Sequence, residues 1–224
     1  MHKVFLHHAT TIILSVAFTC FSSTAVARSE YWEQKVSLFD RLPVNPGDIV
    51  FLGNSITDGG EFSELFGNGK IKNRGISSDV IAGVRERLRQ VTSNSPAKIF
   101  LLIGINDISH DRTIDSIADE YRLLVEDIRT QAPETELYIQ SVMPVNNDFA
   151  RYKKLFGKEE DIRRLNARLK RIADENDASY IDLWECLADP VSGKLRKEFT
   201  NDGLHLLGSG YQAWADAIRN LVEQ

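Results

Sequence analysis

Short apolar runs alternate with longer segments of helical periodicity along most of the chain. The runs at 49–52 and 99–103 are apolar at every position, which is typical of strands that are covered on both faces in a parallel sheet. Together with three further runs they predict five strands, at residues 48–53, 71–73, 98–104, 136–142 and 179–183.

Four segments between or after these runs carry apolar residues at the spacing of one helix face. The stripes are Val80, Val84, Leu88 and Val91; Ile114, Ile117, Tyr121, Leu124, Val125 and Ile128; Ile162, Leu165, Leu169 and Ile172; and Tyr211, Trp214, Ala215, Ile218 and Leu221. Pro133 ends the second helix and Gly208 precedes the last. The alternation predicts an α/β fold with a doubly wound parallel sheet, whose sites lie at the carboxyl ends of the strands.

Composition narrows the class of protein. Of the 224 residues, 42% are hydrophobic and 26% are charged, which suits a folded domain with a substantial core and excludes a disordered chain. No internal repeat or linker divides the chain after residue 27. The formal net charge of −5 argues against nucleic acid as a partner, because a phosphate-backbone binder needs a clustered basic face.

The first 27 residues differ from the rest. Lys3, an apolar run from Thr11 to Phe21 and the sequence 25–27 (Ala-Val-Ala) predict a secretory signal peptide cleaved after Ala27. A lipoprotein signal at Cys20 and retention as an anchor remain as alternatives, although the run is short for a membrane span. We therefore expect a domain at 28–224, secreted or periplasmic, with no membrane insertion after cleavage.

Cleavage at this position changes the candidate chemistry. It removes Cys20 and the first three of the five histidines, leaving Cys186, His110 and His205. A single thiol and two histidines argue against a disulfide framework and against a multi-histidine metal site. We expect no metal and no cofactor.

Polar residues useful for acyl transfer follow the predicted strands. Ser55 comes after the first strand, between small residues that allow a tight turn, and a serine nucleophile needs a base. His205 lies in a loop before the last helix, and Asp202 three residues earlier can accept a hydrogen bond from its ring. These residues form a candidate catalytic triad of Ser55, Asp202 and His205.

A candidate oxyanion hole accompanies this triad. The backbone N–H groups of Ser55 and Gly75 and the side-chain amide of Asn106 all follow strand ends. Each such donor typically contributes about 2.7–4 kcal/mol to the stabilisation of a transition state. Taken singly these residues have simpler explanations, since a serine after a strand often caps a helix and Asp-Gly is a common surface turn.

Four blocks of the sequence together resemble the SGNH (GDSL-like) hydrolase family. They are 53–55 (Gly-Asn-Ser), Gly75, 104–107 (Gly-Ile-Asn-Asp) and 202–205 (Asp-Gly-Leu-His). The family's invariant Ser, Gly, Asn and His correspond in order to Ser55, Gly75, Asn106 and His205. The chain is most similar to the branch of platelet-activating-factor acetylhydrolase-like proteins and bacterial carbohydrate acetylesterases.

This resemblance implies a three-layer, flavodoxin-like sandwich with five parallel strands in the order 2-1-3-4-5, without a cofactor. Asn54 stands where the family often has Asp, a common variant. Other hydrolase patterns are absent: Thr57 replaces the second Gly of a Gly-x-Ser-x-Gly elbow, and the Ser95–Lys98 spacing precedes a strand and is interpreted as a turn.

The sequence thus predicts a secreted serine esterase that removes short acyl groups, with acetyl the first choice, from a small-molecule or glycan ester. Lysophospholipase or thioesterase activity is the alternative, and a non-catalytic binding module is a further one. The loop from Met143 to Lys158 carries aromatic and basic residues that suit a sugar or an anionic substrate, or else only a solvated loop. The oligomeric state stays open.

Five other residues receive structural interpretations. Thr57 and Asp58 are expected to cap the helix after Ser55, and Trp184 to pack in the core. Cys186 is interpreted as a small buried hydrophobic residue. His110 is expected to be a solvated loop histidine, with a place in the substrate cleft as the alternative.

Overall fold

The computed structural model describes residues 28–224, so the predicted signal peptide lies outside the described residues. Five strands form one parallel sheet in the order β2-β1-β3-β4-β5. Their bounds are β1 (Ile49–Gly53), β2 (Ile71–Gly75), β3 (Lys98–Leu102), β4 (Glu136–Gln140) and β5 (Ser179–Ile181). The predicted fold class and strand order are confirmed.

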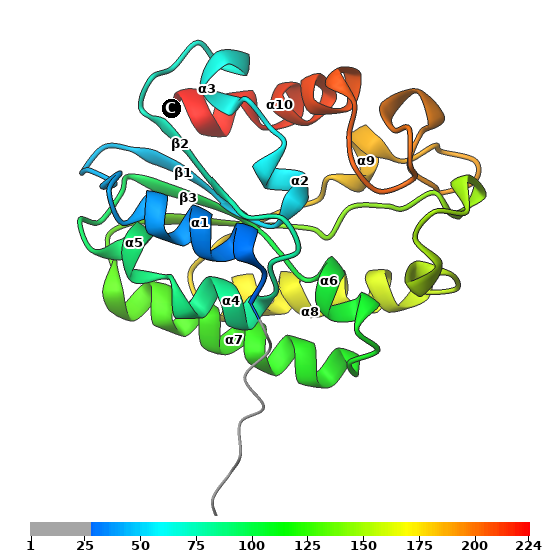
Figure 1. The fold of residues 1–224 in the computed structure, drawn as a ribbon, viewed down its shortest axis with the longest axis horizontal. Coiled ribbons are helices and arrows are strands. Elements are labelled where there is room, and N and C mark those ends of the chain that lie inside the picture. Colours follow the sequence, from blue (N-terminus) through cyan, green and yellow to red (C-terminus); the bar gives the residue numbers. More distant parts are fainter. Residues whose placement is uncertain (1–27) are drawn as a thin grey trace, which may run out of the picture.

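Helices cover both faces of the sheet (Figure 1). One face carries α4 (Ile81–Glu86), α5 (Arg89–Thr92), α7 (Ile114–Gln131) and α8 (Glu159–Glu175), and the other carries α3 (Phe62–Leu65) and α10 (Gly208–Glu223). The remaining helical elements are α1 (Glu30–Phe39), α2 (Ser55–Asp58), α6 (Ile105–Ser109), α9 (Trp184–Leu187), η1 (Asn147–Phe149), η2 (Lys153–Leu155) and η3 (Lys197–Phe199). The result is the expected three-layer sandwich.

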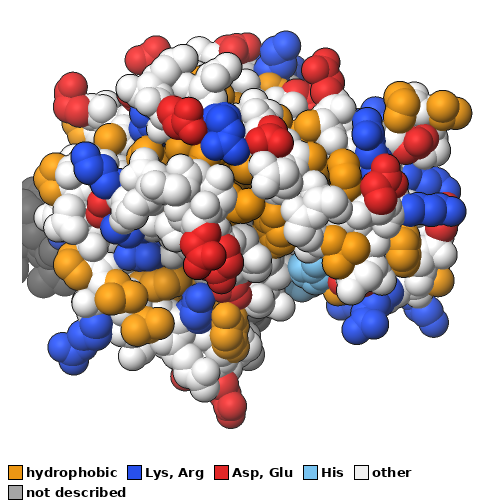
Figure 2. Space-filling model, turned by 90° about the horizontal axis from the view of Figure 1, so that it is seen from above, with side chains coloured by type: hydrophobic (Ala, Val, Ile, Leu, Met, Phe, Trp, Pro, Cys, Tyr) orange, Lys and Arg blue, Asp and Glu red, His pale blue; other side chains and the backbone are white. Residues whose placement is uncertain are grey.

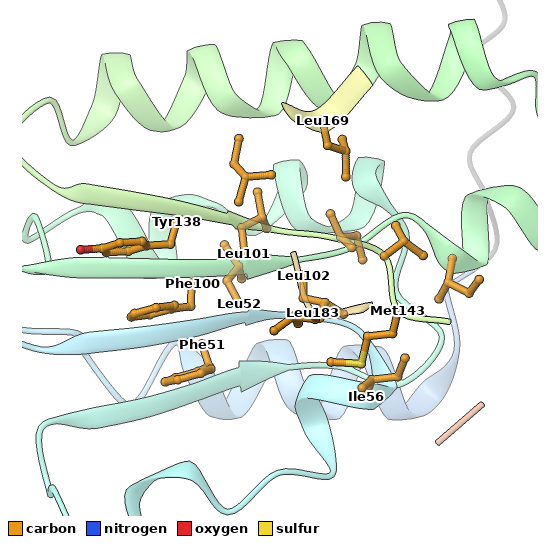
Figure 3. Close-up of a cluster of buried hydrophobic side chains, with 14 of the residues drawn as sticks. Phe51, Leu52, Ile56, Phe100, Leu101, Leu102, Tyr138, Met143, Leu169 and Leu183 are labelled. Carbon is orange, nitrogen blue, oxygen red and sulfur yellow. The ribbon is translucent and has the colours of Figure 1, made fainter. Parts of the chain in front are cut away.

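A row of aromatic side chains crosses the sheet and packs its central strands together (Figure 3). Phe51 of β1 stacks on Phe100 of β3 with ring centroids 5.0 Å apart, and Phe100 stacks on Tyr138 of β4 at 4.6 Å. Phe62 of α3 closes the row against Phe51 at 4.0 Å, and the fully buried Trp214 of α10 meets Phe62 edge-on. This packing holds the strands in register, which brings their carboxyl ends to one edge.

The structure differs from the sequence prediction at several element boundaries. The stripe from Val80 to Val91 is two short helices rather than one, with the break at Arg87 and Leu88. The Arg87 side chain turns into the interior there, where its guanidinium donates to backbone carbonyls of two strands. The first helix, α1, was not predicted from the sequence. In the last helix Val222, rather than Leu221, completes the buried face.

No helix within residues 28–224 is long and apolar enough to cross a membrane. Over the same part of the chain, no cluster of three or more His, Cys, Asp or Glu side chains has a geometry that would hold a metal ion.

Candidate active site

Ser55 lies where β1 passes into α2. β1 ends at Gly53, and Asn54 caps the short helix by accepting a hydrogen bond from the backbone N–H of Ile56 at 3.0 Å. A Cβ on Gly53 would lie 2.3 Å from the carbonyl oxygen of Leu102, so only glycine lets β1 approach β3 this closely at its end. This turn presents the half-buried Ser55 at the carboxyl edge of the sheet.

His205 and Asp202 come from the loop before α10 and meet Ser55 across 150 residues of sequence. His205 Nε2 lies 2.9 Å from Ser55 Oγ, and His205 Nδ1 lies 2.8 Å from Asp202 Oδ2. The other carboxylate oxygen of Asp202 accepts the backbone N–H groups of His205 at 2.8 Å and Leu204 at 2.9 Å. The three residues singled out from the sequence therefore form one hydrogen-bonded chain.

The shape of this loop depends on Gly203, whose φ of +88° is rarely adopted by other residues. A Cβ there would lie 2.2 Å from the carbonyl oxygen of Asn146. The backbone N–H of Asn146 donates to the Gly203 carbonyl at 2.8 Å, and Thr200 Oγ1 accepts the Gly203 N–H at 2.9 Å. The loop is thus held against the segment that follows β4.

The charge state of Asp202 follows from these contacts. Partial burial opposes ionisation, but the hydrogen bonds from His205 and from the backbone of Leu204 and His205 prevail and lower the pKa of Asp202 to about 2. The carboxylate is therefore ionised over the pH range of ordinary enzyme assays. An ionised carboxylate on Nδ1 orients the ring with Nε2 toward Ser55 and stabilises an imidazolium.

Tyr152, from the loop after β4, adds a donor to this chain that the sequence did not predict. Its hydroxyl donates to Asp202 Oδ2 at 3.1 Å and lies 3.1 Å from His205 Nδ1. Its ring meets the imidazole edge-on, with centroids 5.6 Å apart. Burial and the neighbouring Asp202 raise the pKa of Tyr152, so the hydroxyl remains a donor.

We expect Tyr152→Phe to lower activity without disturbing the fold. With one donor fewer, the Asp202 carboxylate is held less firmly against His205, so kcat should fall about fivefold, the typical effect of one hydrogen bond, while KM changes little. Tyr138→Phe, which removes a hydroxyl bonded to Glu136 on β4, serves as control. An unchanged kcat in Tyr152→Phe, or a loss confined to KM, would contradict this positioning role.

Asn106, on α6, lies beside Ser55. One N–H of its side-chain amide donates to the carbonyl oxygen of Asp79 at 2.8 Å, which fixes the orientation of the amide. Asn106 is half-buried and lines the same cleft as Ser55 and His205. The second N–H of the amide is the one that could donate to a ligand in the cleft.

Gly75 does not fit the role expected from the sequence. Its backbone N–H donates to the side-chain oxygen of Asn73 at 2.7 Å, and Gly75 is not among the residues that line the cleft. A Cβ at this position would lie 2.1 Å from the backbone nitrogen of Asp58. The glycine is needed so that β2 can pack directly against α2.

Ser78, which was not singled out from the sequence, lines the cleft, whereas Gly75 does not. It belongs to the turn after β2, closed by the hydrogen bond from Asp79 N–H to the Ile76 carbonyl at 3.1 Å, and has a left-handed backbone with φ of +66°. It lines the cleft with Ser55 and Asn106. Sequence reasoning missed it because Gly or Asn, rather than Ser, normally indicates such a conformation.

From the sequence, Asp58 was expected to cap α2. In the structure, Asp58 instead anchors the turn that contains Ser78. Its Oδ2 accepts the hydroxyl of Ser77 at 2.9 Å and the hydroxyl of Tyr31 at 2.7 Å, and its Oδ1 pairs with Lys35 Nζ at 2.8 Å. Partial burial opposes ionisation, but the hydrogen bonds from Lys35, Tyr31 and Ser77 lower the pKa of Asp58. Helix α1 thereby supports one wall of the cleft.

A buried ion pair lies behind the Ser78 turn. Arg87 Nε donates to Asp79 Oδ2 at 2.9 Å, and both side chains are almost entirely shielded from solvent. Arg87 Nη2 also donates to the carbonyls of Gly53 at 3.2 Å and Arg74 at 3.0 Å, while Trp32 Nε1 donates to Asp79 Oδ1 at 3.1 Å. The ion pair thus connects the ends of β1 and β2 to Asp79, whose backbone carbonyl accepts the hydrogen bond that orients Asn106.

Ser55 and His205 open into a cleft of about 490 Å³, a size typical of small-molecule sites. Figure 2 shows a histidine ring in a hollow, with Lys and Arg side chains gathered at the same end of the molecule. The lining residues are Ser55, Ser77, Ser78, Asn106, Ser109, Arg151, Tyr152, Lys153, Lys154, Leu155, Leu204 and His205.

Three other residues considered from the sequence lie outside this cleft. His110 is exposed at the end of α6 and lines a neighbouring hollow. Trp184 donates its Nε1–H to the Val142 carbonyl at 2.9 Å. Burial raises the pKa of the Cys186 thiol to about 11, so this cysteine is not a thiolate near neutral pH.

The fold and the sequence match together define an ester hydrolase of the acylhydrolase class. Residues 51–213, well over half of the chain, match the model of the GDSL-like lipase/acylhydrolase family. The chain belongs to this family. A comparison with curated proteins finds no match.

Solved structures share the fold over nearly their whole length. A protein from Streptococcus pneumonia, described as a platelet activating factor, is 29% identical with a TM-score of 0.78, covering 86% of this chain and 93% of that one. An acylhydrolase from Bacteroides fragilis is 23% identical with a TM-score of 0.74, covering 88% and 98%. An acetylxylan esterase from Geobacillus stearothermophilus is 16% identical with a TM-score of 0.64, covering 80% and 95%.

Proposed function

We propose that this protein is an exported serine esterase that hydrolyses short-chain O-esters, acetyl esters above all, with residues 28–224 as its hydrolase domain. The observation that carries the proposal is the unbroken chain of hydrogen bonds from Ser55 through His205 to Asp202. This arrangement supplies what a weak serine nucleophile needs, namely a base within hydrogen-bond reach and a carboxylate that orients the base.

In the first half of the reaction, Ser55 Oγ attacks the ester carbonyl while His205 Nε2 takes the hydroxyl proton. The tetrahedral intermediate collapses as the carbon–oxygen bond to the alcohol breaks, and His205 returns the proton to the leaving alcohol. Water then attacks the acyl-enzyme with His205 again as base, which releases the carboxylic acid and restores Ser55.

Three donors are proposed to hold the oxyanion: the backbone N–H groups of Ser55 and Ser78 and the free N–H of Asn106. Within residues 28–224, neither of these backbone N–H groups donates a hydrogen bond to another protein group, and all three residues line the cleft. Ser78 takes the role that the sequence assigned to Gly75, because its N–H, unlike that of Gly75, has no intramolecular acceptor.

The preference for short acyl groups rests on the lining of the cleft. Only Leu155 and Leu204 among its lining residues are aliphatic, so a long acyl chain would find little apolar surface to bury. The structural neighbour that is an acetylxylan esterase is consistent with acetyl transfer from a carbohydrate. Neither observation favours the lysophospholipase alternative.

A chain-length series tests this function. With 4-nitrophenyl esters, we expect kcat/KM to be highest for acetate and to fall at least tenfold by octanoate, because the added methylenes stay in water instead of being buried. The assay records release of 4-nitrophenolate, and acetylated sugars analysed for free acetate extend it to glycans. Equal or faster turnover of octanoate would overturn the short-chain assignment.

A further inference from the structure

The mouth of the cleft carries three basic side chains and no acidic one. Arg151, Lys153 and Lys154 are exposed and line it, and none of the other lining residues is Asp or Glu. Within residues 28–224, none of these three cations takes part in an ion pair with a carboxylate of the chain. Their charges are therefore available to a ligand.

The carboxylates that lie nearby already have partners. Lys158 Nζ pairs with Asp111 at 3.0 Å and Asp161 at 3.7 Å, and Lys194 Nζ pairs with Asp148 at 2.6 Å. Asp202 is bonded to His205 and Tyr152. None of these four carboxylates is paired with Arg151, Lys153 or Lys154.

Residues 151–154, which carry these three cations and are called the basic segment below, are held in place at the mouth of the cleft. Tyr152 is fixed at one side by its hydrogen bond to Asp202. At the other side Leu155 is 2% exposed, and its carbonyl accepts the side-chain amide of Asn147 at 3.1 Å. Because both flanks are anchored, Lys153 and Lys154 stay at the mouth of the cleft, and Arg151 directly precedes the Tyr152 anchor.

The chain as a whole is acidic, with a formal net charge of −5 that already includes these three cations. An anion approaching most of this surface is repelled, whereas the basic segment attracts it directly beside Ser55. Uncompensated charge at the mouth of a cleft raises the local concentration of oppositely charged ligands and their association rate. A positively charged cleft mouth on an otherwise acidic protein therefore favours a negatively charged substrate.

The remaining lining residues indicate what kind of anion fits. Hydroxyl groups predominate, from Ser77, Ser78, Ser109 and Tyr152, and the aliphatic surface is small. The hydroxyls of Ser77, Ser109 and Tyr152 already donate to groups of the protein. They can still accept hydrogen bonds, which suits the hydroxyl donors of a polyol. A lipid would need a broader apolar groove.

We propose that the alcohol half of the ester is an anionic sugar, whose carboxylate or phosphate lies against Arg151, Lys153 and Lys154 while the O-acetyl group reaches Ser55. This inference rests on the esterase function proposed above and specifies its substrate class. Hydrolysis then releases acetate and leaves the negative charge on the sugar.

Three acetyl esters of matched shape test the role of charge. They are 3-acetoxybenzoate, its methyl ester and 3-acetoxyphenyltrimethylammonium, which are anionic, neutral and cationic. At low ionic strength we expect kcat/KM for the anionic ester to exceed that for the neutral ester by about tenfold, and the cationic ester to be the slowest. About 0.5 M salt should reduce these differences severalfold by screening.

Two matched double variants test whether the preference for the anionic ester arises from the basic segment. In Lys153→Gln/Lys154→Gln the ratio of anionic to neutral kcat/KM should fall from about ten to below three. Lys170→Gln/Arg171→Gln removes two exposed cations from α8, lowers the net charge equally and should leave the ratio at about ten. An equal fall in both double variants would overturn the assignment, because it would reflect net charge alone.

Natural-type substrates complete the test. An O-acetylated sugar acid should be hydrolysed about tenfold faster than its methyl ester, and comparison with an O-acetylated sugar phosphate shows which anion is preferred. If the anionic, neutral and cationic acetyl esters are all hydrolysed at equal rates, the substrate inference fails while the esterase function stands. If none is hydrolysed by the folded protein, the esterase function itself fails.

Discussion

Ser55→Ala is expected to lower kcat for 4-nitrophenyl acetate by about 10⁴-fold or more while leaving the protein folded. Without the hydroxyl no acyl-enzyme forms, and His205 loses the group whose proton it takes. Removal of the nucleophile from a serine hydrolase typically leaves only the residual rate that arises from the oxyanion donors and substrate binding. The hydrogen bond that is lost, 2.9 Å from Oγ to His205 Nε2, lies at the half-buried floor of the cleft.

Two measurements separate catalysis from folding in this variant. The thermal unfolding midpoint should stay within a few degrees of wild type, since a small polar side chain is exchanged for a smaller one. Ser63→Ala on α3 is the control and should retain full activity. A fluorophosphonate probe should label wild type at Ser55 and leave Ser55→Ala unlabelled; retention of more than a tenth of the activity would rule out Ser55 as nucleophile.

Arg87→Ala is expected to destabilise the protein by about 3–5 kcal/mol, the range observed when one partner of a buried ion pair is removed. Burial raises the pKa of Asp79 and lowers that of Arg87, so each charge depends on the other. The substitution leaves the Asp79 carboxylate buried without its cation. It also removes the donor to the carbonyls of Gly53 and Arg74 at the ends of β1 and β2.

The half-buried arginine two residues earlier provides a matched control. Arg85 pairs with Asp127 at 2.8 Å, but both side chains are substantially solvent-accessible, so Arg85→Ala should cost less than about 1 kcal/mol. Urea denaturation followed by circular dichroism measures both variants. The double variant Asp79→Asn/Arg87→Met should recover part of the loss, because no unpaired charge remains. A similar small effect for Arg87→Ala and Arg85→Ala would contradict a structural role for the buried pair.

The fold was predictable because hydrophobic periodicity is a local property of the chain. The apolar runs at 49–52 and 99–103 became the two central strands, β1 and β3, and their burial on both faces follows directly from their composition. The helix over 114–128 was equally clear, since its apolar residues face the core in every turn. By contrast, the break at Arg87 depends on hydrogen bonds to Gly53 and Arg74, which no local pattern indicates.

Side chains with distinctive chemistry could be chosen as site candidates from the sequence, whereas the directions of backbone groups could not. Ser55, His205 and Asp202 were recognisable from residue type and position at predicted strand ends. Gly75 was the wrong choice for an oxyanion donor, because the direction of its N–H is decided by the neighbouring Asn73. Ser78 was overlooked because its positive φ comes from the turn that contains it.

The sequence by itself determined the α/β class, the succession of the five strands along the chain, and the residues of the candidate triad. Each of these follows from residue types and their spacing along the chain. Only the tertiary structure decided which groups meet: Ser55 with His205, Tyr152 with Asp202, and the basic segment with an otherwise hydroxyl-lined cleft. Hydrogen bonds and charge compensation depend on distances of a few ångströms between segments far apart in sequence, and those distances exist only once the sheet has packed.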